Sequence, residues 1–198
     1  MMKMFNLWEV ENIKVKEKAL QPYIFISPLL VPRSGGRAAA GQRIWIQKNS
    51  IVERLMNRLM VPGHRGKKHK LTSGHCTGKS NRVYKIVKEV FQIIENETKQ
   101  NPIQVFVSAL ENAAPREEVT SIEYGGARYS KAVDMSPLRR VDLVLRWMVQ
   151  GSYAKSFNSK KSISKALSEE ILNAYKLHQA SNAISKKLEA ERQSDSSR

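Results

Sequence analysis

The sequence has little cysteine, no long apolar run and, over one part of its length, almost no acidic residues. Its only cysteine is Cys76, so no disulfide can form within the chain and a disulfide-stabilised secreted domain is excluded. The longest uncharged run, residues 19–32, contains Pro22 and Pro28 and is shorter than the roughly 20 apolar residues that span a bilayer. Glu9 and Glu11 stand where a signal peptide would be apolar. We therefore expect a cytoplasmic protein without a membrane partner.

The scarcity of acidic residues is local, and it leaves a concentrated block of positive charge. The whole chain has 34 Lys and Arg against 18 Asp and Glu, a net charge of +16. Between Lys18 and Lys88 there are 15 basic residues and one acidic residue, Glu53, whereas the rest of the chain is nearly balanced. Such a block repels itself unless a polyanion neutralises it, which favours nucleic acid as the partner over a merely soluble basic protein.

Apolar residues at helical spacing predict a mainly α single-domain bundle of five to six helices. The expected helices cover residues 50–61, 81–100, 102 to just before Pro115, 136–151, 164–179 and 183–192. Asn101 and Ser136 are expected N-caps, each followed by a proline in the first turn, and Gly151 is expected to end its helix. Residues 1–48 are expected to form a basic N-terminal extension, residues 49–193 the helical domain and residues 194–198 a polar tail.

Two insertions interrupt this domain. Residues 63–81 form a basic loop, and residues 118–135 a β-hairpin that protrudes because both of its faces are polar. Gly125 and Gly126 mark the turn, which places Ile122 opposite Tyr129 and residue 123 opposite residue 128. Residues 23–26 and 43–46 are further candidates for short strands.

Motifs for other chemistries are weak. Residues 74–80 resemble a phosphate loop but have three residues, not four, between Gly74 and the Gly-Lys pair. His64, His69, His75 and Cys76 lack the second cysteine and the regular spacing of a structural zinc site. No triad or paired-carboxylate arrangement is evident, so we expect no catalytic residue, cofactor or metal.

Five stretches of the sequence stand out together: residues 51–60, 101–106, 111–118, 124–127 and 132–142. In this order and register they resemble the family of the universal small-subunit ribosomal protein seven, in its archaeal and eukaryotic branch and most closely its archaeal members. The resemblance covers nearly all of the chain from about Tyr23. The loop at residues 64–80 departs from it by being longer and more basic than the family pattern.

The resemblance implies a non-enzymatic component of the small ribosomal subunit. It implies early binding to the three-prime major domain of small-subunit rRNA, which forms the head, and a hairpin near the exit-site tRNA and the mRNA exit path. It also implies contact with small-subunit ribosomal protein eleven and other head proteins. The resemblance assigns rRNA contacts to Arg54, Arg58, Lys79, Arg82, Arg139, Arg140 and Arg146.

Further candidates come from the basic segments and from the hairpin. The additional rRNA-binding candidates are Arg33, Arg37, Arg43, Lys48, Arg65, Lys67, Lys68, Lys70 and Lys155. The hairpin candidates are Tyr124, Gly125, Gly126, Arg128, Tyr129 and Lys131, with the two tyrosines as candidates for stacking on a nucleotide. Trp45 and Trp147 are interpreted as core residues.

Three alternatives stay open at this stage. A free-standing DNA- or RNA-binding architectural protein explains the charge but not the hairpin. An RNA-modifying enzyme requires a cofactor loop and a catalytic group. A ribosome-associated regulator would bind the particle reversibly.

Overall fold

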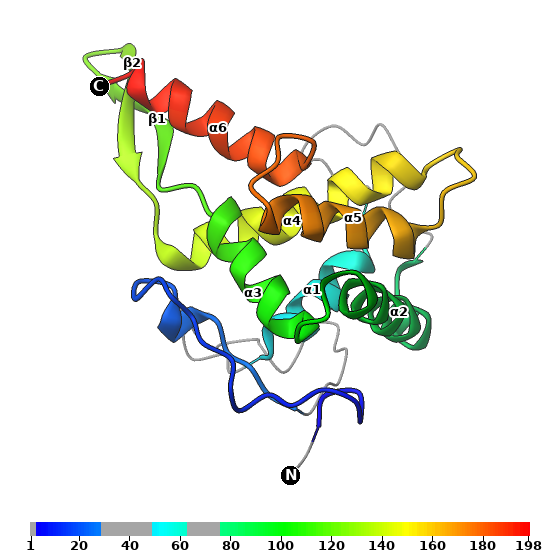
Figure 1. Cartoon of the computed structure of the whole chain (residues 1–198). Coiled ribbons are helices and arrows are strands. Elements are labelled where there is room, and N and C mark those ends of the chain that lie inside the picture. The colour runs from blue at the N-terminus through cyan, green and yellow to red at the C-terminus, as the bar shows by residue number, and fades with distance from the viewer. Residues whose placement is uncertain (1–2, 29–48, 63–75) are drawn as a thin grey trace.

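The computed structural model describes residues 3–28, 49–62 and 76–198. Within these residues the chain forms helices and one antiparallel hairpin, as predicted (Figure 1). In chain order these are η1 (Gln21–Tyr23), α1 (Ile51–Leu59), α2 (Ser80–Thr98), α3 (Pro102–Ala113), β1 (Glu117–Tyr124), β2 (Ala127–Asp134), α4 (Pro137–Ser156), α5 (Ile163–Tyr175) and α6 (Asn182–Asp195). None of the described helices is long and apolar enough to cross a membrane.

The helices bury the apolar stripes that the sequence spacing predicts. Ile51, Val52, Leu55, Met56 and Leu59 of α1 are buried. Phe91 of α2 and Phe106 of α3 are fully buried, with ring centroids 5.9 Å apart. These stripes meet in one core cluster, to which α1–α6 all contribute, so the predicted mainly helical class is confirmed.

The helix ends follow local chemistry in some places and tertiary contact in others. Asn101 caps α3 as predicted, because its side-chain oxygen accepts from the backbone N–H of Ile103 at 3.0 Å. Ser136 precedes α4, but its side chain makes no capping hydrogen bond. The prediction that Gly151 ends α4 is wrong, since the helix continues to Ser156. A Cβ at Gly151 would lie 2.6 Å from the Cβ of Asn182, so this glycine permits close packing of α6.

Residues 3–28, which we call the N-terminal strap, lie within the expected basic N-terminal extension and pack against the helical core through a few buried side chains. Met4, Phe5, Trp8, Leu20 and Ile24 are buried. The rings of Phe5 and Trp8 meet Phe91 edge-on, at centroid distances of 6.0 and 5.8 Å. The expected strand at residues 23–26 does not form, because Tyr23 ends the short helix η1.

Side chains of α3 and of its N-cap Asn101 hold the strap along the helix by hydrogen bonds to its backbone. The amide of Asn101 donates to the Glu9 carbonyl at 2.8 Å. Gln104 accepts from the Lys14 N–H at 2.9 Å and donates to its carbonyl at 3.0 Å. Glu111 accepts from the N–H groups of Lys16 and Glu17 at 2.6 and 2.9 Å. The strap then reaches α1, where the N–H of Ile51 donates to the Phe25 carbonyl at 2.8 Å.

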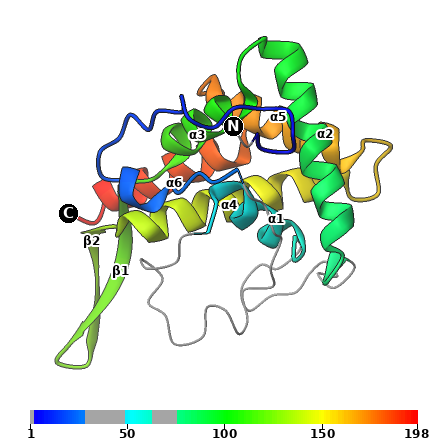
Figure 2. The ribbon, with the colours of Figure 1, turned by 90° about the horizontal axis from the view of Figure 1, so that it is seen from below.

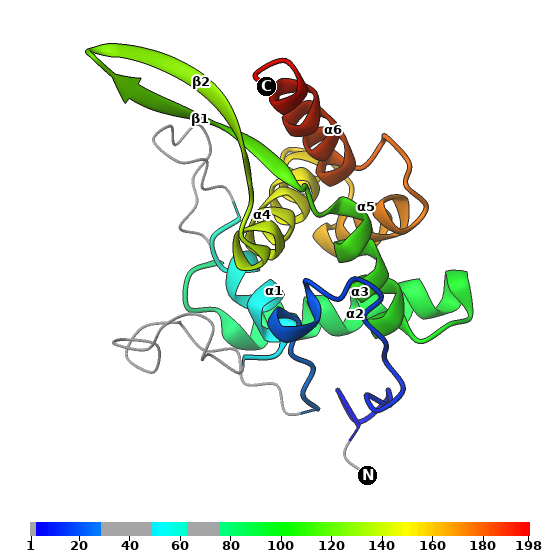
Figure 3. The ribbon, with the colours of Figure 1, turned by 90° about the vertical axis from the view of Figure 1, so that its left-hand side faces the viewer.

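The hairpin extends away from the helical body (Figures 2 and 3). Its register confirms the prediction, with Ile122 opposite Tyr129 and Glu123 opposite Arg128. Gly125 and Gly126 have φ of +59° and +81°, the positive values that a tight hairpin turn requires. The end of α6 lies beside the base of the hairpin, where the N–H of Ala132 donates to the Ser197 carbonyl at 3.4 Å. Residues 194–195, expected in a polar tail, are therefore helical, and Ser194 is buried.

Candidate nucleic-acid interface

Helices α1 and α4 bring three predicted rRNA-binding residues together around one carboxylate. We call Arg54, Arg58, Arg146 and Asp142 the arginine cluster. Nη2 of Arg54 lies 2.9 Å from Oδ1 of Asp142, and Nη1 of Arg54 donates to the Tyr23 carbonyl at 3.2 Å. Arg54 is thus held by α4 and by the strap at once. Arg146 lies one helical turn beyond Asp142 and is exposed.

The charge in this cluster is only partly compensated. Burial lowers the pKa of Arg58 below its ordinary value, and the positive charges of Arg146 and Arg54 lower it further, whereas Asp142 raises it. Arg58 is therefore acted on by both other guanidinium groups and by the Asp142 carboxylate, and among these four described residues three positive charges stand against one negative charge. A phosphate group suits such a site, because a guanidinium offers a planar fork of donors to its oxygens.

The adjacent pair Arg139 and Arg140 does not form one surface. Arg139 is exposed and pairs with Glu118 of β1, with Nε and Oε1 2.6 Å apart, and this hydrogen bond raises the pKa of Arg139. Arg140 is buried, donates to the Pro115 carbonyl at 2.7 Å and pairs with Glu17 of the strap at 2.6 Å. Arg140 therefore ties the strap to α4 and is occupied within the protein, whereas the rRNA contact expected of it stays a prediction.

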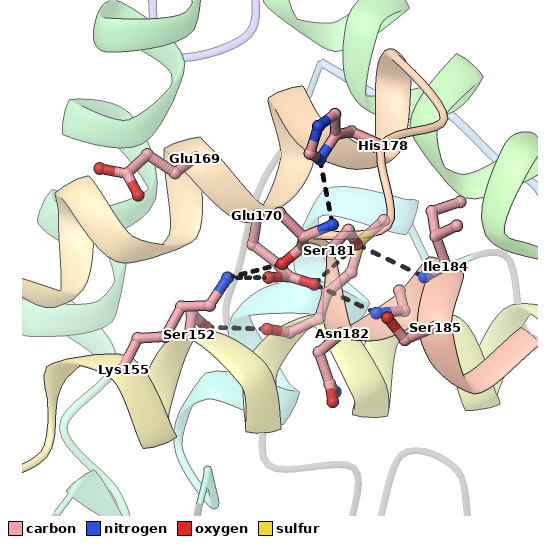
Figure 4. A network of polar contacts seen from close by, with 12 residues as sticks. Ser152, Lys155, Glu169, Glu170, His178, Ser181, Asn182, Ile184 and Ser185 are labelled. Carbon is pink, nitrogen blue, oxygen red and sulfur yellow. Dashed lines mark hydrogen bonds and ion pairs between the residues drawn. The ribbon is translucent and has the colours of Figure 1, made fainter.

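Lys155 is also occupied within the protein. Its ammonium group lies 2.9 Å from Oε2 of Glu170, which is fully buried, and donates to the Ala180 carbonyl at 3.1 Å (Figure 4). Oε1 of Glu170 accepts from the Ser181 hydroxyl at 2.8 Å and from the Ala183 N–H at 3.1 Å. This network fixes the start of α6 against α4 and α5, so the structure gives Lys155 a structural role.

Lys79 and Arg82 lie at the start of α2, and both are exposed. They border a largely apolar cavity of about 280 Å³ that Leu59, Val83 and Ile163 line. Cys76 lies at the same cavity. In the part of the chain that the structure describes, no group of three His, Cys, Asp or Glu side chains is placed to hold a metal ion.

Eight of the predicted basic residues lie outside the described ranges. They are Arg33, Arg37, Arg43, Lys48, Arg65, Lys67, Lys68 and Lys70. The three histidines weighed as zinc ligands, His64, His69 and His75, lie outside these ranges as well, and so does Trp45. Trp147 is half-buried and packs against the core.

The hairpin tip carries its predicted side chains in the open. The side chains of Tyr124 and Tyr129 are 81% and 60% exposed, which makes their rings available for stacking. Arg128 faces Glu123 with 3.8 Å between Nε and Oε2, and Lys131 is exposed on β2. Aromatic and basic groups therefore alternate along an arm that stands clear of the core.

The sequence reasoning missed the acidic partners of these cations. These partners are Asp142 for Arg54, Glu17 for Arg140 and Glu170 for Lys155. The helical spacing of Asp142 and Arg146 was the one available signal, because it places both on one face. The partners of Arg140 and Lys155 lie 123 and 15 residues away along the chain, and no local pattern connects them.

Comparison with known proteins identifies the family of the chain. A family model described as "Ribosomal protein S7p/S5e" matches residues 36–198. The chain is 54% identical over 197 residues to "Small ribosomal subunit protein uS7" of Nanoarchaeum equitans, a match that covers all of this chain and 99% of that protein. It is 44% identical to the protein of that name from Methanothermobacter thermautotrophicus and 43% identical to that from Methanosphaera stadtmanae, each over at least 95% of both chains. The chain therefore belongs to the ribosomal protein S7p/S5e family, in its archaeal branch.

Proposed function

We propose that the chain is an architectural rRNA-binding protein that uses the arginine cluster of α1 and α4 as its central phosphate-binding surface. Membership of the family makes it a ribosomal protein of the small subunit, which acts in translation in the cytoplasm. The observation that carries the proposal is that Arg54, Arg58 and Arg146 gather around the carboxylate of Asp142, so that positive charge is in excess among these four residues. Because the scaffold is helical and the strap fixes Arg54, these charges are pre-organised for a folded RNA.

The finer parts of the proposal concern the place of the protein in the particle. We propose that it binds early to the three-prime major domain of small-subunit rRNA and organises the head. The exposed hairpin would reach the exit-site tRNA and the mRNA exit path, with Tyr124 and Tyr129 stacking on nucleotides. Small-subunit ribosomal protein eleven and other head proteins are the proposed protein neighbours. The role is architectural and not catalytic.

The basic segments outside the described ranges would add further phosphate contacts. These are residues 29–48, which contain Arg33 and Arg37, and residues 63–75, which make up most of the basic loop predicted at residues 63–81. Each phosphate contact contributes modestly, so affinity depends on many contacts at once.

The test measures binding of the full chain to a transcript of the three-prime major domain over a range of salt concentrations. The double variant Arg58→Ala with Arg146→Ala should weaken binding and reduce the slope of log affinity against log salt by about 1.4 to 1.8, because two phosphate contacts are lost. Arg192→Ala, which removes one exposed cation from α6, should change the slope far less. An unchanged slope in the double variant would exclude this face as the interface.

A competitor distinguishes the proposal from the alternative of a free-standing DNA- or RNA-binding protein. Duplex DNA added at equal mass should fail to displace the rRNA transcript, because specificity comes from the shape of a folded RNA and from unpaired bases. Efficient displacement by duplex DNA would favour the alternative.

A further inference from the structure

A groove of about 450 Å³ lies between α4 and α6, next to the arginine cluster. Arg146, Trp147, Gln150 and Ala154 line it from α4, and Lys186 lines it from α6. Arg146 belongs to both features, so the groove and the cluster form one continuous surface. The volume lies within the range of small-molecule sites, about 300–1,000 Å³.

The walls of the groove are fixed by contacts within the protein. Gly151 lets the start of α6 approach α4 closely, as its Cβ contact distance to Asn182 indicates. The Asn182 amide donates to the Trp147 carbonyl at 2.8 Å, which joins the two helices directly beside the groove. The buried Glu170 network holds the preceding turn (Figure 4). A groove with such walls needs little rearrangement to receive a ligand.

The chemistry of the lining suits a nucleotide. The charged residues that line it are Arg146 and Lys186, both cationic and both exposed, and Lys186 forms an exposed ion pair with Glu189 one turn further along α6. The Ala183 N–H at the start of α6 already donates to Glu170, so an anion in the groove would be bound by the cationic side chains. Trp147 lines the same wall and is half-buried, and an aromatic residue in this place is a candidate platform for stacking of a base.

We propose that this groove receives one unpaired nucleotide of the rRNA, with its base against Trp147 and its phosphate between Arg146 and Lys186. The inference rests on the proposed function, because the same RNA must occupy the arginine cluster. Charge complementarity favours RNA over a protein segment: Arg146 and Lys186 line the groove, no carboxylate belongs to its lining, and the ion pair of Lys186 with Glu189 is exposed and therefore weak enough to be exchanged for a phosphate contact. Sequence-specific recognition of RNA mostly uses such splayed, unpaired bases, because side chains cannot read the deep, narrow major groove of the A-form helix.

Two variants of the full chain test the groove without touching Arg146. Ala154→Phe fills the groove without changing charge, and Lys186→Gln removes one cation from its wall. Lys165→Gln is the matched control, because Lys165 is an exposed lysine on α5 outside the groove. Binding to the three-prime major domain transcript is measured as affinity and as salt slope. Circular dichroism and thermal unfolding verify that each variant is folded.

We expect Ala154→Phe to weaken binding about tenfold with little change in salt slope, because it displaces a stacked base. Lys186→Gln should reduce the slope by about 0.8, and Lys165→Gln should match the unmodified chain. Ultraviolet cross-linking of the complex should attach a nucleotide to the peptide that contains Trp147. If Ala154→Phe fails to fold, the salt slope of Lys186→Gln and the cross-link at Trp147 still test whether a nucleotide occupies the groove.

Other results would overturn the inference in distinguishable ways. Loss of affinity in the Arg58 and Arg146 variant, with unchanged binding in both groove variants and no cross-link at Trp147, would leave the proposed function standing and remove the groove. No binding of the unmodified chain would remove the proposed function itself. If Ala154→Phe binds the rRNA transcript with unchanged affinity but another protein no longer joins the small subunit, the groove is a protein-binding site and the inference is wrong.

Discussion

Neighbouring arginines on α4 have opposite roles because of where the helix points them. Successive residues are turned by roughly 100° around a helix axis. Arg139 therefore lies at the surface beside Glu118, whereas Arg140 points inward to Glu17 and the Pro115 carbonyl. Their charges are the same, and the difference between a surface ion pair and a buried one determines what each contributes.

Replacing these two residues separately measures that difference. Arg140→Ala should lower the free energy of unfolding by about 3–5 kcal/mol, because it leaves Glu17 and a buried carbonyl without their partner. Arg139→Ala should cost less than about 1 kcal/mol, because its pair with Glu118 is exposed. Urea unfolding followed by circular dichroism gives both values. Equal values for the two variants would contradict the structural role of Arg140.

The elements show where local sequence chemistry is sufficient and where it is not. The Gly125-Gly126 turn fixed the hairpin register correctly, because a two-residue turn leaves only one pairing of the flanking strands. The predicted end of α4 at Gly151 is wrong, although a glycine near the end of a helical pattern usually marks the end of the helix. Here its missing side chain makes room for Asn182, which belongs to another helix.

The end of the chain is tied to the hairpin by an ion pair that depends on pH. Arg198 lies 2.5 Å from Glu117, and this hydrogen bond holds the pKa of Glu117 below its ordinary value. Because the folded pKa is the lower one, the contact is fully present above the unfolded pKa and is lost as the pH falls through the folded pKa. We expect the carboxyl carbon of Glu117 to titrate below the ordinary glutamate range in an NMR experiment.

The control for this titration is a change of the partner residue. Arg198→Ala should return the midpoint of Glu117 to the ordinary glutamate range, whereas Arg192→Ala should leave it displaced. A midpoint that is ordinary in the unmodified chain would show that the end of α6 is not docked on the hairpin in solution.

At the scale of the whole molecule, the N-terminal strap contacts both the core and the arginine cluster, although the sequence predicts a basic N-terminal extension there. The strap supplies Trp8 and Phe5 to the aromatic centre around Phe91 and supplies Glu17 to Arg140. It also supplies the carbonyl of Tyr23 that holds Arg54 in the arginine cluster. Core stability and the proposed interface are therefore linked through the same segment.

A pair of adjacent residues tests whether the strap is part of the core in solution. Trp8→Ala should lower the free energy of unfolding by about 3–5 kcal/mol, because it removes a buried ring. Leu7→Ala should change it by less than about 0.5 kcal/mol, because Leu7 is 46% exposed. Chemical denaturation of both variants supplies the comparison. A Trp8 variant as stable as the Leu7 variant would mean that the strap is not docked.

The amino-acid sequence alone was enough for the helices, the hairpin register, the cationic character and the family, because periodicity, turn residues and family motifs are local patterns. It also identified Arg54, Arg58 and Arg146, which the fold brings together. Only the tertiary structure decided which groups Arg140 and Lys155 contact. It also decided where the strap lies and that a groove forms between α4 and α6. The physical reason is that these contacts join residues far apart along the sequence, as Arg54 and Asp142 are, 88 residues apart. Burial of a side chain results from such long-range contacts, so no local pattern predicts it.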